Sequence, residues 1–255
     1  NYTPGQMQVA LTRSAPNIQG NVDGSFVYAN GSSLSSSLTP AFTNVNLSDF
    51  SGGVSSYSDA SYSEVGLLSL DIQDANYGGQ GIVLNADNVN IGRFIPHHFE
   101  QTIADDGLFQ ATCSTAMSFI AYSGQKDQET ASKGAISYLT NPVLEITAYN
   151  KQGAVTQNYY QDAEGSENDF MKLSSSSISI VTPTQDEQAT GVNGNYLSVE
   201  ANLSEGILSQ FDLTNTTSTN PLPRGVLHYQ LSSDDHFFYP RSANTKVAPF
   251  TANIN

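Results

Sequence analysis

The sequence predicts an all-β protein made of tandem β-sandwich domains with an immunoglobulin-like arrangement of strands. Charged residues make up only 13% of the 255 positions, about half of the ~25% that is usual, and long amphipathic helices need such residues on their solvent faces. The 13 Tyr and 12 Phe residues favour strands, because aromatic rings pack well across neighbouring strands. Several strand-like segments also follow one another closely in the second half of the chain, and this spacing is typical of a sandwich.

An irregular β domain is expected over residues 1–92. Its clearest strand is Val65–Ile72, an apolar run that we expect to be buried. The segment Asp71–Gly79 is predicted to be a turn, and Gly81–Asn85 is predicted to return as a second strand. Shorter candidate strands are Met7–Leu11, Gly24–Tyr28 and Ala41–Leu47.

Residues 93–218 are expected to form an immunoglobulin-like β-sandwich. Its clearest feature is a hairpin in which Pro142–Tyr149 alternates, Asn150–Gly153 turns the chain, and Ala154–Tyr160 returns. Lys126–Tyr138 is the place where we expect a short helix or a loop excursion. Residues 219–255 are expected to supply closing strands or the start of a further β domain. The other strand segments predicted here are Leu108–Tyr122 (an interrupted pair), Ser177–Val181, Asn195–Ala201, Leu208–Leu213 and Gly225–Leu231.

The stretch Gly92–Phe99 is interpreted as a stiff junction between the first two domains. Pro96 cannot sit in a central strand and fixes its own φ angle. Phe94 and Phe99 offer apolar surface to bury, and Arg93 is expected to pair with a neighbouring carboxylate or with carbonyl groups. A flexible linker would instead be rich in Gly and Ser.

The charge balance argues against two classes of partner. With 24 acidic and 9 basic residues, the formal net charge is -15, so nucleic acids and anionic membrane surfaces are disfavoured.

The sequence has no apolar run of about 18 residues, and no membrane span is expected. The single cysteine, Cys113, excludes an internal disulfide and is expected to be a buried thiol.

Oxygen-bearing side chains gather around the predicted turn at Asp71–Gly79. Asp71, Asp74, Asn76 and Asp87 flank the hairpin that contains this turn, and carboxylate and amide oxygens in flexible loops are the ligands that Ca²⁺ prefers. The spacing of an EF-hand is absent, and acidic loops are usually only solvated. These four residues are therefore weak candidates for a calcium site, and no other cofactor is expected.

Histidines and catalytic motifs give little support for an enzyme. His97 and His98 are adjacent, and neighbouring side chains on a strand point to opposite faces, so both could reach one metal ion only through a turn. Pro96 permits such a turn, but packing at the domain junction is favoured over metal ligation. Asp234–His236 and His228 form a second weak cluster, interpreted as a loop between strands. No nucleophile elbow, zinc-protease, Walker or dinucleotide-binding motif occurs. We therefore expect no catalytic residues and no enzymatic activity.

Four stretches of the sequence carry a family resemblance. Together they resemble the large C-terminal region of MshQ-type proteins, which are encoded with the mannose-sensitive haemagglutinin (MSHA) type IV pilus of Gram-negative bacteria. The pattern Gly-Arg-Phe-x-Pro-x-His-Phe is the most specific piece, and the chain departs from the family pattern at His97 and Ser123. The four stretches are Tyr62–Gly66 with Asp74–Gly78, then Gly92–Phe99, then Cys113 with Phe119–Gln125, and finally Ile146–Gly153 with Thr156–Tyr159.

The resemblance implies a cell-surface or pilus-associated protein and brings no active-site residues to carry over. We expect a non-enzymatic structural or adhesin-like module at the extracellular or outer-membrane surface of a Gram-negative bacterium. Its expected partners are other pilus-assembly or cell-surface proteins, with surface glycans as further contacts. Two alternatives stay open: a carbohydrate-active enzyme, which would need two carboxylates in one cleft, and a calcium-dependent glycan-binding module.

Overall fold

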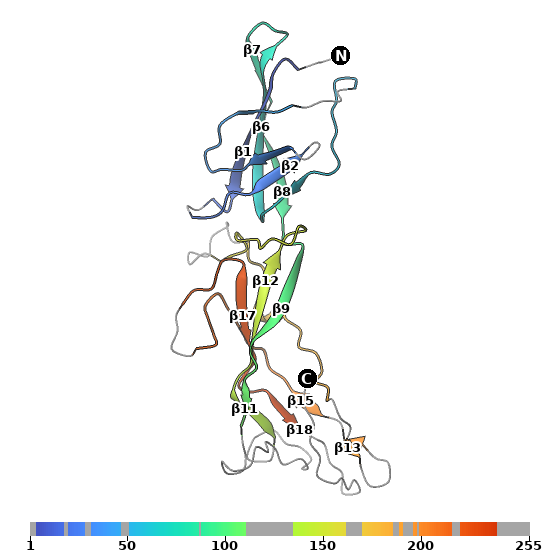
Figure 1. Ribbon diagram of the computed structural model, residues 1–255, viewed down its shortest axis with the longest axis vertical. Coiled ribbons are helices and arrows are strands. Elements are labelled where there is room, and N and C mark those ends of the chain that lie inside the picture. The colour runs from blue at the N-terminus through green and yellow to red at the C-terminus, as the bar shows by residue number, and fades with distance from the viewer. Residues whose placement is uncertain are drawn as a thin grey trace. The chain divides into compact units, whose positions relative to one another are not determined.

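The computed structural model divides the chain into two compact units (Figure 1). Unit 1 comprises Asn1–Glu100, Thr147–Lys172 and Leu222–Val226, and unit 2 comprises Gln101–Ile146, Leu173–Pro221 and Leu227–Asn255. Both units are discontinuous in sequence, whereas the expected domains 1–92, 93–218 and 219–255 are continuous stretches whose boundaries stay a prediction. The structure describes residues 4–17, 20–28, 32–46, 51–86, 88–110, 135–161, 170–185, 189–190, 196–197, 199–215 and 220–238.

The fold is all-β, as the composition predicts. Among the described residues, the secondary structure consists of strands apart from one 3₁₀ turn, η3 at Ser175–Ser177. The strand pairs with a described register are antiparallel. The described part of the chain contains no helix that is long and apolar enough to cross a membrane.

Unit 1 contains a five-stranded sheet in the order β4-β1-β6-β7, with β8 also paired to β6. The ladder between β1 and β6 runs from the pair Met7 and Asp74 to the pair Ala15 and Leu67. This long ladder makes β1 and β6 the centre of the sheet. The strand bounds are β1 Met7–Ala15, β4 Thr43–Asn44, β6 Gly66–Tyr77, β7 Ile82–Asn85 and β8 Val89–Phe94.

A second, three-stranded sheet of unit 1 has the order β3-β2-β5. Its strands are β2 Ser25–Tyr28, β3 Ser32–Ser35 and β5 Ser61–Tyr62. Side chains from both sheets meet in one hydrophobic core, so this part of unit 1 is a sandwich. The buried members of that core are Val9, Leu11, Leu34, Val45, Tyr62 and Leu68.

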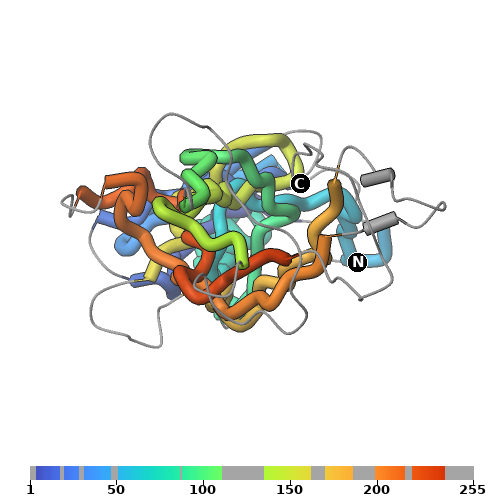
Figure 2. The backbone as a smooth tube through the Cα atoms, turned by 90° about the horizontal axis from the view of Figure 1, so that it is seen from below, coloured from blue at the N-terminus to red at the C-terminus, as the bar shows by residue number. Residues whose placement is uncertain are grey.

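Unit 2 contains a four-stranded sheet in the order β10-β11-β18-β15. Its core contains Phe109, Tyr138 and Phe237, whose ring centroids lie 5.2 to 5.8 Å apart. β11 and β18 pair although they are far apart in the sequence, and Figure 2 shows these two segments side by side. The strand bounds are β10 Leu108–Phe109, β11 Ile136–Thr140, β15 Glu200–Asn202 and β18 His236–Phe238.

A further four-stranded sheet has the order β16-β17-β12-β9, and β13 pairs with β14 in a two-stranded sheet. Residues of β9, β12 and β17 are divided between the two units. The strand bounds are β9 His98–Asp105, β12 Val143–Tyr149, β13 Ala189–Thr190, β14 Tyr196–Leu197, β16 Ile207–Ser209 and β17 Val226–Gln230.

Three local predictions are wrong. The expected turn at Asp71–Gly79 is largely strand, because β6 continues to Tyr77 with β1 on one side and β7 on the other. Ser177–Val181 is not a strand, since η3 ends there and Val181 is 84% exposed. The return segment Ala154–Tyr160 makes only an isolated bridge between Tyr149 and Val155.

Two predictions lie partly or wholly outside the described residues. Cys113 is not described, so its burial stays a prediction. Lys126–Tyr138 was expected to form a helix or loop, and its described end, from Ile136 onward, belongs to strand β11. An extended segment there is consistent with the β-branched and aromatic residues that it contains.

The stretch Gly92–Phe99 lies within unit 1, and its residues are exposed or only partly buried. The Phe94 ring packs 5.0 Å from the Tyr62 ring and borders the sandwich core. Phe99 is 44% exposed and Ile95 is 71% exposed, so the expectation that both phenylalanines are buried is wrong for Phe99. The Arg93 guanidinium lies 5.0 Å over the ring of Phe170, which is a cation–π contact. Its expected pairing with a carboxylate or with carbonyl groups stays a prediction.

Candidate functional site: an amide-lined pocket between β1 and β4

Three of the four predicted calcium candidates lie in strand β6. Asp71 and Asp74 are three positions apart on that strand, so their side chains point to opposite faces of the sheet. Asn76 uses its side-chain carbonyl oxygen to accept the Gly81 N–H at 2.8 Å, and Asp87 lies outside the described residues. Within the described segments, no group of three or more His, Cys, Asp or Glu could hold a metal ion. Calcium binding stays a prediction.

Asp74 has a structural role at the start of β1. Its Oδ1 accepts the N–H groups of Gln6 at 2.8 Å and Asn76 at 3.0 Å, and its Oδ2 accepts the Gly5 N–H at 2.9 Å. Asp74 is only 3% exposed, so these donors take the place of water around the carboxylate. Gly5 fits closely here, because a Cβ atom on it would lie 1.9 Å from the Asn76 carbonyl oxygen. The backbone of Gly5 and Gln6 is therefore fixed.

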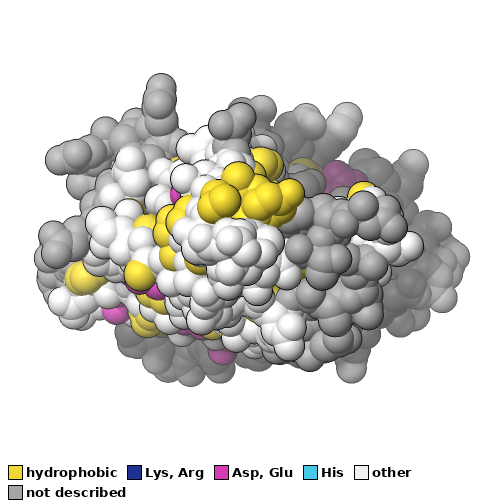
Figure 3. Space-filling view, turned by 90° about the horizontal axis from the view of Figure 1, so that it is seen from above, with side chains coloured by type: hydrophobic (Ala, Val, Ile, Leu, Met, Phe, Trp, Pro, Cys, Tyr) yellow, Lys and Arg dark blue, Asp and Glu magenta, His cyan; other side chains and the backbone are white. Residues whose placement is uncertain are grey.

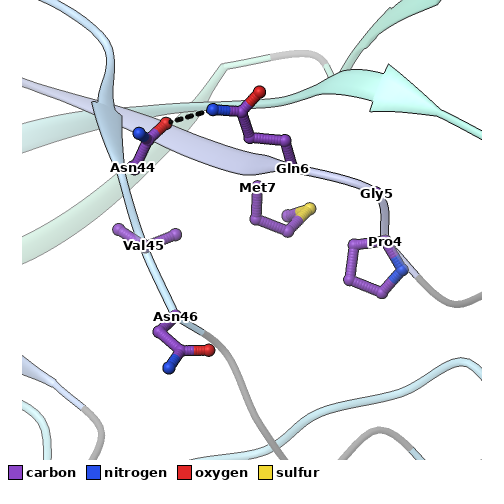
Figure 4. A pocket seen from close by; sticks show the side chains of 7 residues that line it. All are labelled: Pro4, Gly5, Gln6, Met7, Asn44, Val45 and Asn46. Carbon is purple, nitrogen blue, oxygen red and sulfur yellow. Dashed lines mark hydrogen bonds between the residues drawn. The ribbon is translucent and has the colours of Figure 1, made fainter. Parts of the chain in front are cut away.

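Beside this fixed backbone lies an open pocket of about 390 Å³. Figure 4 shows the two segments that form it, the start of β1 and the end of β4, with the Met7 side chain between them. The Val45 N–H donates to the Met7 carbonyl oxygen at 2.9 Å and holds the two segments together. The pocket is lined by Pro4, Gly5, Gln6, Met7, Asn44, Val45 and Asn46.

The amide side chains at the pocket form a connected network. Asn44 Oδ1 accepts the side-chain N–H groups of Gln6 at 3.0 Å and Gln8 at 2.8 Å. The Gln73 side chain donates in turn to Gln8 Oε1 at 2.5 Å. Each amide therefore limits the rotation of the next, and the network orients Asn44 at the pocket wall.

The network belongs to a row of amides that crosses the outer face of the five-stranded sheet. Gln8 of β1 is paired in register with Asn44 of β4 and with Gln73 of β6. Gln73 is paired with Asn85 of β7. Residues directly opposite one another on antiparallel strands project from the same face. The amide row Asn44, Gln8, Gln73 and Asn85 therefore spans four adjacent strands.

The pocket carries no formal charge of its own, since none of its lining residues is Asp, Glu, Lys, Arg or His. Its polar groups are the amides of Gln6, Asn44 and Asn46, and its apolar groups are Pro4, Met7 and Val45. Met7 lies opposite Val45 on the core side of the sheet, whereas Gln8 and Asn44 lie opposite each other on its outer side.

Residues 64–255 match the family model described as DUF6701, third domain. The chain belongs to the DUF6701 family. No curated protein and no solved structure matches the chain. In this DUF6701 chain the match covers β6, β7 and β8, whereas β1 and β4 precede it. The pocket is therefore built from residues before the match, while Asp74, which fixes its wall, lies within it.

A second polar arrangement of the DUF6701 chain lies elsewhere in unit 1, around the buried Glu64. Its Oε1 accepts the Gln157 N–H at 3.1 Å and its Oε2 accepts the Asn158 N–H at 3.0 Å. Burial raises the pKa of Glu64 above its usual value, and these N–H groups and the Arg224 charge act in the opposite direction. Because Gln157 and Asn158 donate to Glu64, they cannot form the predicted return strand. The Asn158 side chain in turn bonds both the N–H and the carbonyl of Val22 at 2.8 Å.

The predicted histidine clusters form other contacts than expected. The Nδ1 atoms of His97 and His98 lie 3.0 Å apart, so the pair adopts the turn that Pro96 permits and not the opposite faces of a strand. The reason is that β9 begins only at His98, and His97 still belongs to the turn after Pro96. His98 stacks on Tyr149 with ring centroids 5.5 Å apart, which is the packing role that was favoured.

In unit 2, His228 is buried in β17 between two partly exposed carboxylates. Its Nδ1 accepts the Leu213 N–H at 3.1 Å and lies 3.5 Å from Asp212 Oδ1, while its Nε2 lies 3.9 Å from Glu145 Oε2. Hydrogen bonds from Thr214 lower the pKa of Asp212. The sequence predicted a cluster of His228 with Asp234–His236, whereas the structure places His228 beside Asp212 and Glu145.

Asp234 and Asp235 lie in the loop between β17 and β18, as expected, whereas His236 begins β18; within this loop the Asp235 carboxyl group is fully buried. Its Oδ1 accepts the Ser204 N–H at 2.6 Å, and its Oδ2 has no hydrogen-bond partner among the described residues. Burial raises the pKa of Asp235. Burial, together with the Asp235 charge, also raises the pKa of Tyr138 to about 12.

A group of exposed apolar side chains marks the β6–β7 hairpin. Tyr77, Ile82, Val83 and Leu84 are each between 41% and 51% exposed. Figure 3 views unit 1 from the side of this hairpin and shows hydrophobic side chains gathered on the surface. β7 is the last strand in the sheet order, so its outer edge has no paired strand in the described structure.

The pocket residues were not among the predicted site residues. A signal for them was present in Gln6-Met7-Gln8-Val9, where amides alternate with apolar side chains. Such alternation predicts a strand with one amide face. The partner Asn44 lies far away in the sequence, and only the pairing of β1 with β4 brings it to the pocket.

Proposed function

We propose that this DUF6701 chain is a non-enzymatic, adhesin-like module of an MshQ-type protein of the MSHA pilus system. It would be displayed at the outer surface of a Gram-negative cell, with pilus-assembly or other surface proteins as partners. Family membership over residues 64–255 supports the proposal at the level of DUF6701. The resemblance carried by Gly92–Phe99 and the other motifs supports the finer assignment to the MshQ type.

The proposal is supported mainly by the hydrogen bonds that the buried carboxyl groups accept. The buried acidic residues of the described chain are Glu64, Asp74 and Asp235. Each of them accepts main-chain N–H groups from a segment that is distant in sequence: residues 157–158, residues 5–6, and residue 204. These carboxyls therefore fix irregular segments to strands, as a rigid display module requires.

Such carboxyls are poorly suited to acid–base catalysis. A general acid or base must exchange a proton with a substrate group within hydrogen-bond reach. The oxygens of Glu64 and Asp74 are instead engaged by N–H donors of the protein itself. None of the residues that line the pocket between β1 and β4 has a side chain that titrates. Binding fits these residues better than proton transfer does.

One arrangement favours the alternative of a carbohydrate-active enzyme. His228 lies between Asp212 and Glu145, whose side chains are 30% and 42% exposed. A histidine and two carboxylates could serve hydrolysis if a substrate reached them. Here Nδ1 of His228 already accepts the Leu213 N–H, so that ring nitrogen is occupied by the backbone. The non-enzymatic reading is therefore preferred.

The location is tested in a bacterium that produces the protein. An epitope-tagged protein is treated with protease on intact cells, and sheared pili are probed for its presence. We expect cleavage on intact cells and recovery of the tagged protein with the pilus fraction. A protein that resists external protease and stays in the cytoplasmic fraction would overturn the proposal.

Two further measurements separate the alternatives. The purified chain is incubated with a panel of oligosaccharides, and reducing ends are counted. We expect no release above that of an Asp212→Asn, Glu145→Gln double variant. Thermal melts with calcium and with a chelator test the calcium-dependent module, for which a higher melting temperature in calcium is required. If calcium does not change the melting temperature, that alternative fails.

A further inference from the structure

We infer that His97 and His98 form a two-nitrogen chelate for a divalent transition-metal ion, and that Cu²⁺ is the ion that this chelate binds most tightly. The two residues lie at the start of β9, within unit 1. Their Nδ1 atoms are 3.0 Å apart. The inference is independent of the proposed adhesin-like function.

The separation of the two nitrogens fits two neighbouring positions around one metal ion. With metal–nitrogen distances of about 2.05 Å, two ligand nitrogens lie about 2.9 Å apart at a right angle and about 3.3 Å apart at the tetrahedral angle of Zn²⁺ sites. The observed 3.0 Å is closer to the right angle, which is the tetragonal geometry of Cu²⁺ and Ni²⁺. Because sites of a given kind hold Cu²⁺ more tightly than the other divalent first-row ions, Cu²⁺ is the expected ion.

The metal-free pair is already close to the arrangement that the ion requires. Without an ion, a proton on one Nδ1 makes an N–H···N hydrogen bond across the same 3.0 Å. A bound cation needs the lone pairs of both Nδ1 atoms, so this proton moves to the other nitrogen of its ring or is released to water. The two rings then keep nearly the same separation.

Tyr149, the last residue of β12, holds both histidines before an ion arrives. The His97 N–H donates to the Tyr149 carbonyl oxygen at 2.7 Å. The His98 ring stacks on the Tyr149 ring, with centroids 5.5 Å and planes 18° apart. This stack uses the face of the His98 ring and leaves Nδ1 at its edge. Because the pair is held in place, less conformational freedom is lost on binding.

Glu100 orients the second ligand. Its Oε1 lies 3.5 Å from His98 Nε2. A carboxylate beside Nε2 favours the proton on that nitrogen and leaves Nδ1 with a free lone pair. Histidine ligands of metals commonly direct their other ring nitrogen toward a carboxylate in this way. Glu100 is therefore a positioning residue, and the ion lies on the opposite side of the His98 ring.

The chelate is open to solvent. The His98 side chain is 39% exposed, and His97 is exposed as well. The formal net charge of -15 favours the approach of a cation. Within the described residues, no group of three or more His, Cys, Asp or Glu could hold a metal ion. The site therefore has two ligands from the described chain, and water takes the remaining positions around the ion.

Titration of the metal-stripped whole chain with CuSO₄, NiCl₂ and ZnCl₂ tests the inference. Calorimetry in a glycine buffer, which suppresses weak copper binding elsewhere on the chain, gives the affinities. We expect Cu²⁺ to bind more tightly than Ni²⁺ or Zn²⁺. Electron paramagnetic resonance of the copper complex should show a tetragonal ion with two imidazole nitrogens.

The variants separate ligands from the residue that positions them. His97→Gln changes an exposed side chain, and His98→Phe keeps a ring on Tyr149, so both should fold. Each should remove the two-nitrogen signal and weaken copper binding more than Glu100→Gln does. Glu100→Gln should weaken binding about tenfold, the lower end for such partners, and keep the two-nitrogen signal. His236→Gln, which removes a histidine outside the pair, is the matched control and should leave the affinity unchanged.

Three results would overturn the inference. They are equal copper binding by the wild-type chain and the double variant His97→Gln, His98→Phe, tighter binding of Zn²⁺ than of Cu²⁺, and wild-type affinity in either single variant. Thermal melts without metal check that each variant is folded. If His98→Phe does not fold, the exposed His97→Gln change still decides between the outcomes. Protease accessibility on intact cells, which tests the proposed function, does not depend on copper.

Discussion

Unit 1 and unit 2 are both built of antiparallel strands, but different interactions hold them together. In unit 1 the ladder between β1 and β6 extends from Met7 to Ala15, and the core draws on strands of two sheets. In unit 2 the strands β10, β15 and β18 are only two or three residues long. Their packing centres on three aromatic rings, those of Phe109, Tyr138 and Phe237.

The two units also treat a buried carboxyl group differently. In unit 1 both oxygens of Asp74 accept main-chain N–H groups. In unit 2 one oxygen of Asp235 has no partner among the described residues. A buried polar atom without a partner costs about 1–3 kcal/mol. The comparison teaches that unit 1 satisfies both oxygens of its buried Asp74, whereas the described part of unit 2 tolerates an unpaired carboxyl oxygen at Asp235.

The largest effect is expected for Phe237→Ala in unit 2. The change removes a ring that contacts both Phe109 and Tyr138, and it should lower the free energy of unfolding by about 3–5 kcal/mol. Urea denaturation followed by tyrosine fluorescence measures it. Leu68→Ala, at a fully buried position of unit 1, is the matched change and should cost about 2–4 kcal/mol. A larger loss for Leu68→Ala than for Phe237→Ala would reverse the contrast between the units.

The second-largest effect is a difference in stability loss between two variants of the Gly92–Phe99 stretch, Phe94→Ser and Phe99→Ser. Phe94 borders the sandwich core, and Phe94→Ser should cost about 2–3 kcal/mol. Phe99 is 44% exposed and keeps an edge contact with Tyr159, so Phe99→Ser should cost about 1 kcal/mol. Thermal melts of the two single variants and limited proteolysis give the comparison. Equal losses of stability would show that the exposed fraction of each ring does not determine its contribution to the free energy of unfolding.

The third effect concerns Asp235 and depends on pH. Because burial raises the pKa of Asp235, the folded state holds this proton more tightly than the unfolded state does. The stabilisation is therefore fully present below the unfolded pKa of about 3.9 and is lost as the pH rises through the folded pKa. Asp235→Asn does not titrate, and its amide keeps an oxygen for the Ser204 N–H.

We therefore expect the wild-type protein to lose stability relative to Asp235→Asn as the pH is raised from 4 to 7. Urea denaturation at several pH values measures the difference. Asp234→Asn, a change at the exposed neighbour, is the control and should show a smaller pH dependence. A difference that is constant over this range, or that grows in favour of the wild-type protein, contradicts the raised pKa.

The smallest effect is expected for the exposed hairpin of unit 1. Ile82→Ser combined with Leu84→Ser changes side chains that are 51% and 43% exposed, so the free energy of unfolding should change by less than about 0.5 kcal/mol. Solubility should rise, because an exposed apolar edge strand promotes association. Light scattering at increasing concentration measures association. A substantial loss of stability would mean that these side chains contribute to the fold of unit 1.

The sequence predicted the elements whose pattern is local. β1, β2, β6, β7, β12 and β17 overlap predicted strands, because alternation and apolar runs are properties of one segment. The segment Ala154–Tyr160 shows the limit of this reasoning. Its composition favours a strand, but the N–H groups of Gln157 and Asn158 donate to Glu64, which is more than ninety positions away. A distant acceptor of this kind leaves no mark on the local pattern.

The candidate site shows the same division between local and distant information. The sequence drew attention to Asp74 as an oxygen donor, and the structure gives that carboxylate a place beside the pocket, where it binds the backbone of Gly5 and Gln6. The amides of Gln6 and Gln8 were visible as an alternating pattern. Their partner Asn44 could not be assigned, because the register of a short strand such as β4 is set by contacts across the sheet.

The sequence by itself determined that this protein is all-β, that it carries a strong negative charge, and that the motifs of common enzymes are absent from it. These conclusions follow from composition and from periods of a few residues, which need no knowledge of distant partners. Only the tertiary structure decided that Asp74 and Glu64 hold backbone segments and that amides from four strands form one row. Burial, pairing and register depend on residues far apart in the chain, and folding alone brings them within hydrogen-bond distance.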